Sequence, residues 1–473
     1  MNSDSASSMD VSGGGSSSSV DMTVEDEIDE EMIEKLWAKE RYEMEVGDRE
    51  ATDYELHGVE SRYDTSKLEN PENHYEALIL FDNELNNPDS GLSEKKKRGY
   101  LRALRLKSSY ISSSDFRLRF LRAEFFDIPK AVARFCNCLN FMLDLYGEDS
   151  LLRQLFITDL TKRERKLLKE GSMQLSPTRD SLGRRTMFLL GNVGENYSTR
   201  ERDRTGFYFI YQVLAEDETT QRNGLVTVHL MSEGVQKSMG GENMGEASKT
   251  FVSFFESCPL RFSAIHMCFP NELLYRLLKP IMLWVVGNTG RKCLRIHSGT
   301  RMECDYSLNT FGVRPDDVPT TYSGTIKTRQ HARWLKVRGA MDDFIKQQCR
   351  DCVDGDYRDF YASDKHTIKP FPYIQCPEIN CVLFHKNGVA WEFPGNVAFR
   401  AFLDEQLPFN HQLNIRSPGT TQSNGSDGPI KEGFVNRIVR LSFEENFQFL
   451  LYDESKHWYN ELKSPAIKTT TAR

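Results

Sequence analysis

The stretch that decides the fold is residues 258–324, CPLRFSAIHMCFPNELLYRLLKPIMLWVVGNTGRKCLRIHSGTRMECDYSLNTFGVRPDDVPTTYSG. It predicts a buried strand at 261–269, a hinge at 269–271 and an apolar helix at 271–286. A basic turn then leads into a second strand at 293–297. The helix is too short, and too interrupted by Arg276, Lys279 and Pro280, to span a bilayer, so we expect it to lie in a core or at an interface.

The same alternation extends backwards along the chain. Further strands are predicted at 185–190 and 225–231, and further helices near 205–215 and 244–257. Strands that alternate with helices favour an α/β sandwich with a mostly parallel sheet. Upstream, residues 94–147 are predicted to be helical, with Asp127 as the cap of a helix whose first turn contains Pro129.

Two sets of motifs resemble the CRAL-TRIO (Sec14-like) family. Residues 119–131, RFLRAEFFDIPKA, are similar to the family pattern "RFLRARxFDxxKA" in its small N-terminal helical subdomain. Downstream, Ile265-His266, Lys279-Pro280 and Arg291-Lys292 follow the family order of a strand "IH", a helix "KP" and a basic turn. The resemblance covers roughly residues 95–325. It implies a mostly parallel sheet flanked by helices, with the helix at 271–286 as a lid over an apolar pocket.

The resemblance also implies which residues meet the ligand. The pocket wall and lid are expected to comprise Val226, Val228, Leu230, Ile265, Met267, Leu273, Leu274, Leu277 and Ile281. Positions that bind phosphoinositide phosphates in tocopherol-transfer-type members correspond to Arg119, Arg122, Arg291, Lys292 and Arg295. Arginine and lysine suit this role because they donate several charge-assisted hydrogen bonds to phosphate oxygens. The alternative is that these residues are solvated surface charges.

Two departures from the family narrow the ligand. Yeast phospholipid-transfer members have a glutamate where this chain has Leu260, and hydroxyl residues where it has Val226 and Val228. Buried polar head groups need hydrogen-bonding partners. Exchange of phosphatidylinositol and phosphatidylcholine is therefore less expected than binding of another lipid or apolar molecule.

The domain boundaries follow changes in composition. A disordered Ser/Gly-rich leader is expected first, then an acidic helix and loops, with the helix near 24–45 and loops through most of 61–90. The helical subdomain, the lipid-binding domain, a connector and a C-terminal domain follow. The expected ranges are 1–23 for the leader, 24–90 for the acidic helix and loops, 94–147 for the helical subdomain, 150–325 for the lipid-binding domain, 326–375 for the connector and 376–473 for the C-terminal domain.

The C-terminal domain is expected to be a small α+β unit. Pro394-Gly395-Asn396, Phe399-Arg400 and Trp458 resemble a short algal domain of unknown function. The chain departs from that pattern at residues 384–388, FHKNG, where the family has "FGRG". Nucleic-acid binding by this domain is not expected, because acidic residues flank its predicted hairpin.

Charge is unevenly distributed along the chain. Of a net charge of −8, residues 1–60 carry 18 acidic and 4 basic residues, a net of −14, which leaves +6 for the remainder. A mildly basic body behind an acidic leader suits an anionic membrane surface or phosphate head groups. The apolar fraction of 39% and the absence of a secretory signal pattern predict a soluble, cytoplasmic protein with possible peripheral membrane association.

The sequence contains no catalytic signature. His266 lies alone in an apolar strand, and residues 287–292, GNTGRK, lack the spacing of a phosphate-binding loop. Ten cysteines without a secretory signal predict reduced thiols. A zinc site formed by Cys349, Cys352, Cys376 and Cys381 is a less favoured alternative, because the second pair has unusual spacing. We therefore expect neither an enzyme nor a bound cofactor or metal.

The predicted function is non-enzymatic binding, and possible transfer or sensing, of a lipid or other hydrophobic molecule at an anionic membrane surface. The alternative is an adaptor protein. In that case the lipid module is passive, and the acidic leader or the C-terminal domain binds a protein partner.

Overall fold

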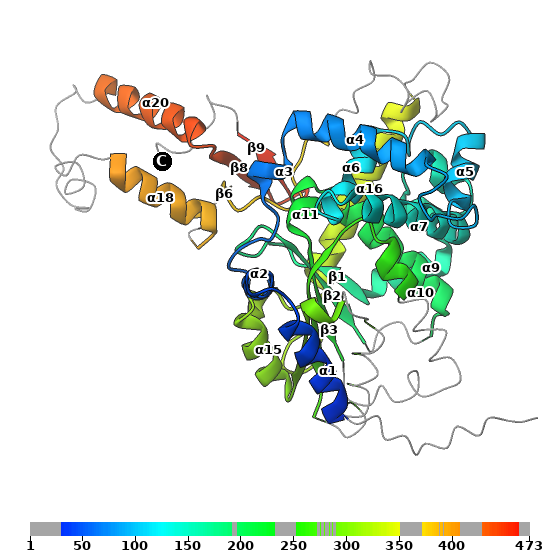
Figure 1. The fold of residues 1–473 in the computed structure, drawn as a ribbon. Coiled ribbons are helices and arrows are strands. Elements are labelled where there is room, and N and C mark those ends of the chain that lie inside the picture. The colour runs from blue at the N-terminus through cyan, green and yellow to red at the C-terminus, as the bar shows by residue number, and fades with distance from the viewer. Residues whose placement is uncertain are drawn as a thin grey trace, which may run out of the picture.

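The structure is a computed structural model that describes residues 30–191, 196–231, 252–271, 275, 279, 283, 286, 290–350, 371–386, 388–390, 392–406 and 428–462. Within these residues the chain forms two β-sheets, each with its own helices (Figure 1).

The larger sheet has its strands side by side in sequence order. They are β1 (Met173–Leu175), β2 (Arg185–Leu190), β3 (Leu225–Leu230), β4 (Phe262–Phe269) and β5 (Leu294–Ser298). β1 is antiparallel to β2, and β2 to β5 are parallel. The four strands predicted from the sequence are β2 to β5, with boundaries that differ by at most one residue. The predicted α/β class with a mostly parallel sheet is confirmed, whereas β1 was not predicted.

One face of this sheet, here called the crossover face, carries the odd-numbered positions of β2, β3 and β4. Met187 of β2 is aligned with Thr227 of β3, then with Ile265 of β4 and Leu294 of β5. The connection from β2 to β3 packs on the β2 end of this face. It comprises α10 (Thr199–Phe207), η2 (Tyr208–Leu214, wound as a π-helix) and α11 (Glu218–Asn223). The predicted helix at 205–215 is therefore confirmed as α10 and η2.

The opposite face, here called the α15 face, is covered by α15 (Arg301–Asn309) and α2 (Val46–Leu56). Leu308 of α15 and Leu56 of α2 are fully buried against Val228 and Ala264 of the sheet. In Figure 1, α2 and α15 lie on one side of the strands and α9 and α10 on the other. The sheet therefore separates two apolar cores.

The predicted helical region at 94–147 is confirmed. It contains α5 (Arg98–Arg105), α6 (Ser114–Ala123) and α7 (Ile128–Tyr146). The carboxylate of Asp127 accepts a hydrogen bond from the Lys130 amide at 3.2 Å, as expected of an N-cap. Shorter elements follow α7. They are α8 (Asp149–Leu152), η1 (Ile157–Asp159) and α9 (Lys162–Glu170).

The prediction of loops at 61–90 is wrong. This region contains α3 (Thr65–Leu68) and the 16-residue α4 (Pro71–Asn86). Asn70 caps α4, and Ala77, Phe81 and Leu85, four residues apart, are buried among α5, α6 and α7. The four-residue spacing of these apolar residues indicates a helix, but the polar residues between them made the region resemble a loop.

The connector at 326–375 contributes to the core of the unit that is built on the larger sheet. α16 (Thr328–Arg350) inserts Arg338, whose side chain is 1% exposed. The Arg338 guanidinium pairs with Asp342 at 3.0 Å and Glu216 at 2.9 Å. Trp334 stacks on Phe209 with ring centroids 4.8 Å apart. The contacts with Phe209 and Glu216 attach α16 to η2 and to the short segment that follows it.

The C-terminal unit is the small α+β structure expected from the sequence. Its sheet has the order β7-β6-β8-β9. The elements are β6 (Cys381–His385), β7 (Gly388–Val389), α18 (Pro394–Gln406), α20 (Gly428–Glu444), β8 (Gln448–Asp453) and β9 (Trp458–Glu461). The Asn396 amide group donates to and accepts from the Leu383 backbone, at 2.9 and 2.7 Å, so the Pro-Gly-Asn motif joins α18 to β6. Glu378 pairs at 2.8 Å with Arg179, which lies between β1 and β2 of the larger sheet.

A histidine pair lies on the α15 face. His266 Nδ1 and His297 Nε2 are 3.1 Å apart, and both residues are buried. Burial, with a smaller contribution from nearby Arg295, lowers the pKa of His297 to about 4. Burial also lowers the pKa of His266, with contributions from His297, Arg184, Arg295 and His57. Both rings are therefore neutral at pH 7.

This pair predicts acid sensitivity. A histidine whose pKa is lower in the folded than in the unfolded protein binds fewer protons when folded, so stability falls as pH falls from about 6.5 to about 4. His297 accounts for about 3 kcal/mol of this loss. The measurement is the free energy of unfolding in urea across this pH range. His297→Gln should show a smaller fall than the parent protein, and an equal fall would contradict the assignment.

Candidate functional site

The helix that the sequence assigns as a lid is described at a few positions. Tyr275, Leu283 and Val286 are helical and buried, at 2%, 1% and 7% exposure. They belong to one apolar cluster with Ile265 and Met267 on the crossover face. The Tyr275 and Phe269 rings stack at 5.3 Å. Leu273, Leu274, Leu277 and Ile281 lie outside the described residues.

The predicted pocket wall is wrong in part. Val226, Val228 and Leu230 lie in the core beneath α15, whereas Ile265 and Met267 lie on the crossover face. These two groups point to opposite sides of the sheet, because side chains alternate along a strand and the register pairs Thr227 with Ile265. A wall that contains Ile265 and Met267 must instead use Thr227 and His229 of β3.

A row of side chains crosses the crossover face near the carboxyl ends of the strands. It consists of Leu189, His229, Met267 and Ile296, one from each of β2 to β5. Leu189, His229 and Ile296 are only half-buried, whereas every member of the preceding row, Met187 to Leu294, is buried. We call these four residues the exposed row, although Met267 within it is buried and the other three are partly exposed. It is a largely apolar surface beside the helix that contains Tyr275 and Leu283.

Two polar groups interrupt this apolar face. Thr227 is 2% exposed, and its hydroxyl has no hydrogen-bond partner in the part of the chain that the structure describes. Burial lowers the pKa of His229 to about 4, so its ring is neutral. A buried hydroxyl without a partner is destabilising. Together the two side chains could bind one polar group of a mainly apolar ligand.

The five basic residues predicted for a head group do not gather at one place. Arg122 is 5% exposed and inside the helical subdomain, where it pairs with Glu69 at 2.8 Å and Glu218 at 2.6 Å. Arg119 lies on the same helix, with its guanidinium 5.5 Å from the Phe116 ring centroid. The prediction of a surface role is wrong for Arg122, because long-range ion pairs satisfy it in the interior.

Arg291 and Arg295 are covered by the N-terminal helices. Arg291 pairs with Glu40 of α1 (Glu30–Tyr42) at 2.7 Å, and its backbone carbonyl accepts a hydrogen bond from Trp37 Nε1 at 2.9 Å. Arg295 pairs with Asp53 of α2 at 3.1 Å. Burial and nearby Arg41 lower the pKa of Arg295 to about 10. The acidic leader therefore supplies carboxylates where the sequence suggested phosphates.

Lys292 remains without such a partner. Within the described residues its ammonium group has no ion pair, and it lines a groove of about 890 Å³ between the α1–α2 turn and α7. Arg62 and Lys130 line the same groove. Acidic groups of the α1–α2 turn and of the start of α2, among them Glu43 and Asp48, line the groove as well.

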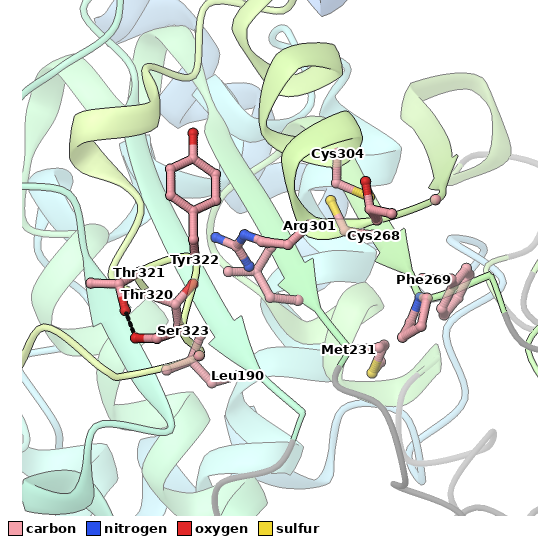
Figure 2. A pocket seen from close by; sticks show the side chains of 15 residues that line it. Leu190, Met231, Cys268, Phe269, Arg301, Cys304, Thr320, Thr321, Tyr322 and Ser323 are labelled. Atoms are coloured by element: carbon pink, nitrogen blue, oxygen red, sulfur yellow. Dashed lines mark hydrogen bonds between the residues drawn. The ribbon is translucent and has the colours of Figure 1, made fainter.

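A second cavity, of about 370 Å³, opens at the carboxyl ends of β2, β3 and β4 (Figure 2). Ligands of parallel α/β sheets commonly bind at this edge. Arg301 points into it from the start of α15 and pairs with Asp305 at 2.9 Å. Thr321 and Ser323 of the facing loop form a 2.8 Å hydrogen bond. Sequence reasoning missed this cavity, although hydroxyl residues in 320–324 offered a signal.

Two cysteines form part of the cavity wall. Cys268 is the penultimate residue of β4, and Cys304 lies in the first half of α15. Their side chains meet in the cavity, as Figure 2 shows. Other cysteines have separate environments: Cys376 Sγ contacts the Pro177 carbonyl at 3.5 Å, and Cys381 Sγ contacts Gln448 Oε1 at 3.3 Å.

The proposed zinc cluster gains no support from these positions. Cys349 packs with Phe156 and Ile345, and Cys352 lies outside the described residues. Among the residues that the structure describes, no three His, Cys, Asp or Glu side chains are placed to hold a metal ion.

No protein-family model matches the chain. A helix with the length and apolar character needed to cross a bilayer is not found in the described residues.

The unpartnered Thr227 hydroxyl predicts an unusual response to substitution. Thr227→Val should leave the free energy of unfolding unchanged or raise it by about 1 kcal/mol, because no hydrogen bond is lost. The matched control is Thr205→Val, since the buried Thr205 hydroxyl donates to the Glu201 carbonyl at 2.8 Å. That change should cost about 1 kcal/mol. Urea denaturation compares the two, and an equal loss in both variants would show that Thr227 has a partner.

Proposed function

We propose that the protein is a non-enzymatic carrier or sensor of a lipid or other small hydrophobic molecule, built on a CRAL-TRIO fold. The observation that supports this most directly is the exposed row, a largely apolar strip of the crossover face beside Tyr275 and Leu283. Covering this strip with an apolar ligand would be favourable by about 25 cal/mol per Å² removed from water, offset by the entropy of association.

The motif resemblance supports the same site. The helix that bears the Lys279-Pro280 motif follows, in sequence, the strand with the Ile265-His266 motif, in the order that the family has for its lid. Its described apolar residues pack with Ile265 of that strand. The hinge at residues 269–271 directly precedes this helix. Ligand entry would separate the helix from the crossover face while the α15 face keeps its own core.

Thr227 and His229 limit the ligand chemistry. The neutral His229 ring and the Thr227 hydroxyl can each donate or accept a hydrogen bond, but neither supplies charge. The favoured ligand therefore has a long apolar body and an uncharged polar group. Sterols, isoprenoid alcohols and acylglycerols have this chemistry.

Membrane contact would involve Arg291, Lys292 and Arg295 after release of α1. Arg291 also donates to the Leu283 carbonyl of the lid helix at 3.0 Å, so one guanidinium contacts both the lid helix and Glu40. An anionic surface that replaced Glu40 as the partner of Arg291 would therefore bind next to the lid helix. This arrangement would couple membrane contact to lid movement.

The exposed row gives the first test. Ile296→Lys, at a half-buried position of the edge strand β5, should abolish ligand uptake because it places a charge on the apolar strip. Uptake is measured by native mass spectrometry of the full chain after incubation with vesicles that contain a sterol, an isoprenoid alcohol and a diacylglycerol.

The control for this test is Met302→Lys on α15, which is 63% exposed and should bind as the parent protein does. A parent protein that remains free of lipid after incubation would contradict the carrier function. It would favour the adaptor alternative, in which the acidic leader or the C-terminal domain binds a protein partner.

The covered arginines give a second test. The double variant Glu40→Gln, Asp53→Asn should bind phosphatidylserine-containing vesicles more tightly than the parent protein, by roughly tenfold or more. The reason is that two freed arginines contribute about 1 kcal/mol each near an anionic surface. Vesicle flotation at several salt concentrations measures this affinity.

The matched control for the arginines is Asp316→Asn, Glu454→Gln, which makes the same change in net charge at exposed positions outside the groove that contains Lys292. Equal tightening in both double variants would show that net charge alone acts, and that α1 does not cover a binding surface.

A further inference from the structure

Cys268 and Cys304 come together from elements that are distant in sequence. Cys268 belongs to β4, the strand that precedes the hinge. Cys304 belongs to α15, the helix that follows β5. Both are nearly buried, at 4% and 3% exposure, yet both line the 370 Å³ cavity at the carboxyl ends of the strands. Small molecules that enter this cavity can reach the two sulfur atoms.

The two cysteines belong to the same apolar cluster beneath α15, and Figure 2 shows their side chains next to each other. Cys304 Sγ also lies 3.9 Å from the His297 carbonyl oxygen, to which its proton can be donated. Figure 2 shows Arg301 extending into the same cavity. The neighbouring Cys268 thiol lowers the pKa of Cys304, and the positive charge of Arg301 contributes in the same direction. The neighbouring Cys304 side chain, together with burial, raises the pKa of Cys268 well above its ordinary value.

We propose that Cys268 and Cys304 form an oxidation site for small hydroperoxides, with Cys304 as the attacking thiol and Cys268 as the resolving thiol. This site lies on the α15 face and does not depend on ligand binding at the crossover face.

The chemistry balances with one peroxide. The Cys304 sulfur attacks one oxygen of hydrogen peroxide, the O–O bond breaks, and the thiol proton leaves with the departing hydroxide as water. Cys304 is then a sulfenic acid. The Cys268 sulfur attacks the Cys304 sulfur, the S–O bond breaks, and a second water leaves with the Cys268 proton. Two thiols are oxidised by two electrons to a disulfide, and the peroxide is reduced to water.

The position of the pair gives the bond a structural consequence. A bond between Cys268 and Cys304 would close a loop that contains the hinge, the lid helix and β5. Because Cys268 immediately precedes Phe269 and Pro270, the bond would fix the start of the hinge to α15. Oxidation should therefore slow hydrogen exchange in the residues at the end of β4.

The test is peptide mapping of the full chain after exposure to hydrogen peroxide, without reduction. A peptide pair linked through Cys268 and Cys304 is expected, lighter than the two separate peptides by two hydrogen atoms and separated by dithiothreitol. The proposal is overturned if both cysteines remain free thiols while the half-buried Cys293 is oxidised. It is also overturned if Cys268 or Cys304 links only to another cysteine.

Variants assign the two roles. Cys268→Ser should leave Cys304 as a sulfenic acid that dimedone traps, and Cys304→Ser should abolish both the trapped product and the link. The matched control, Cys293→Ser, should form the Cys268–Cys304 link as the parent protein does. Dimedone labelling of Cys268 in Cys304→Ser would reverse the two roles and overturn the assignment of Cys304 as the attacking thiol. If a variant fails to fold, the peptide map of the parent protein still shows whether Cys268 and Cys304 become linked.

Discussion

The attachment of the N-terminal segment to the sheet depends on one buried carboxylate. Glu55 of α2 is 3% exposed; its side chain pairs with Arg261 at 2.7 Å, and its backbone carbonyl accepts a hydrogen bond from Arg184. Arg184 is fully buried and also pairs with Asp180 at 2.6 Å. Removing one partner of a buried ion pair costs about 3–5 kcal/mol, because the other charge is left uncompensated. α2 therefore stays on the sheet, and the α15 face is a permanent core.

The strands could be predicted from the sequence, but the face to which each side chain points could not. Apolar runs located β2 to β5 to within one residue, because four to eight apolar residues between polar turns suffice to identify a buried strand. Such runs are apolar on both sides, so they contain no alternation that would show which of Val228 and Thr227 shares a face with Ile265. That choice is made by the register between strands, which depends on residues far apart in the chain.

The roles of the arginines could not be predicted for a related reason. Arg122 and Arg291 both belong to motifs of basic residues, yet Arg122 is paired with Glu69 inside the helical subdomain and Arg291 with Glu40 on α1. Both partners lie more than 50 positions away in sequence, and neither carboxylate belongs to a motif. Local sequence identifies a cation, whereas the tertiary fold decides which anion neutralises it. The cavity beside Arg301 was missed because strand ends, α15 and a distant loop jointly form it.

The two ends of the N-terminal segment differ in how readily an external charge could displace them. Glu55 is held by the two buried arginines Arg261 and Arg184. Asp53, in contrast, is 37% exposed and pairs with Arg41 of α1, and Glu40 borders the groove that contains Lys292. An anionic surface attracts Arg291 and repels Glu40, so its field acts on both members of this pair in the direction of separation. The net charge of −14 in residues 1–60 adds to the repulsion, while Arg261 and Arg184 continue to hold Glu55. Under the proposed function, a membrane would displace α1 while α2 keeps the α15 face closed, and the change would be confined to the crossover face.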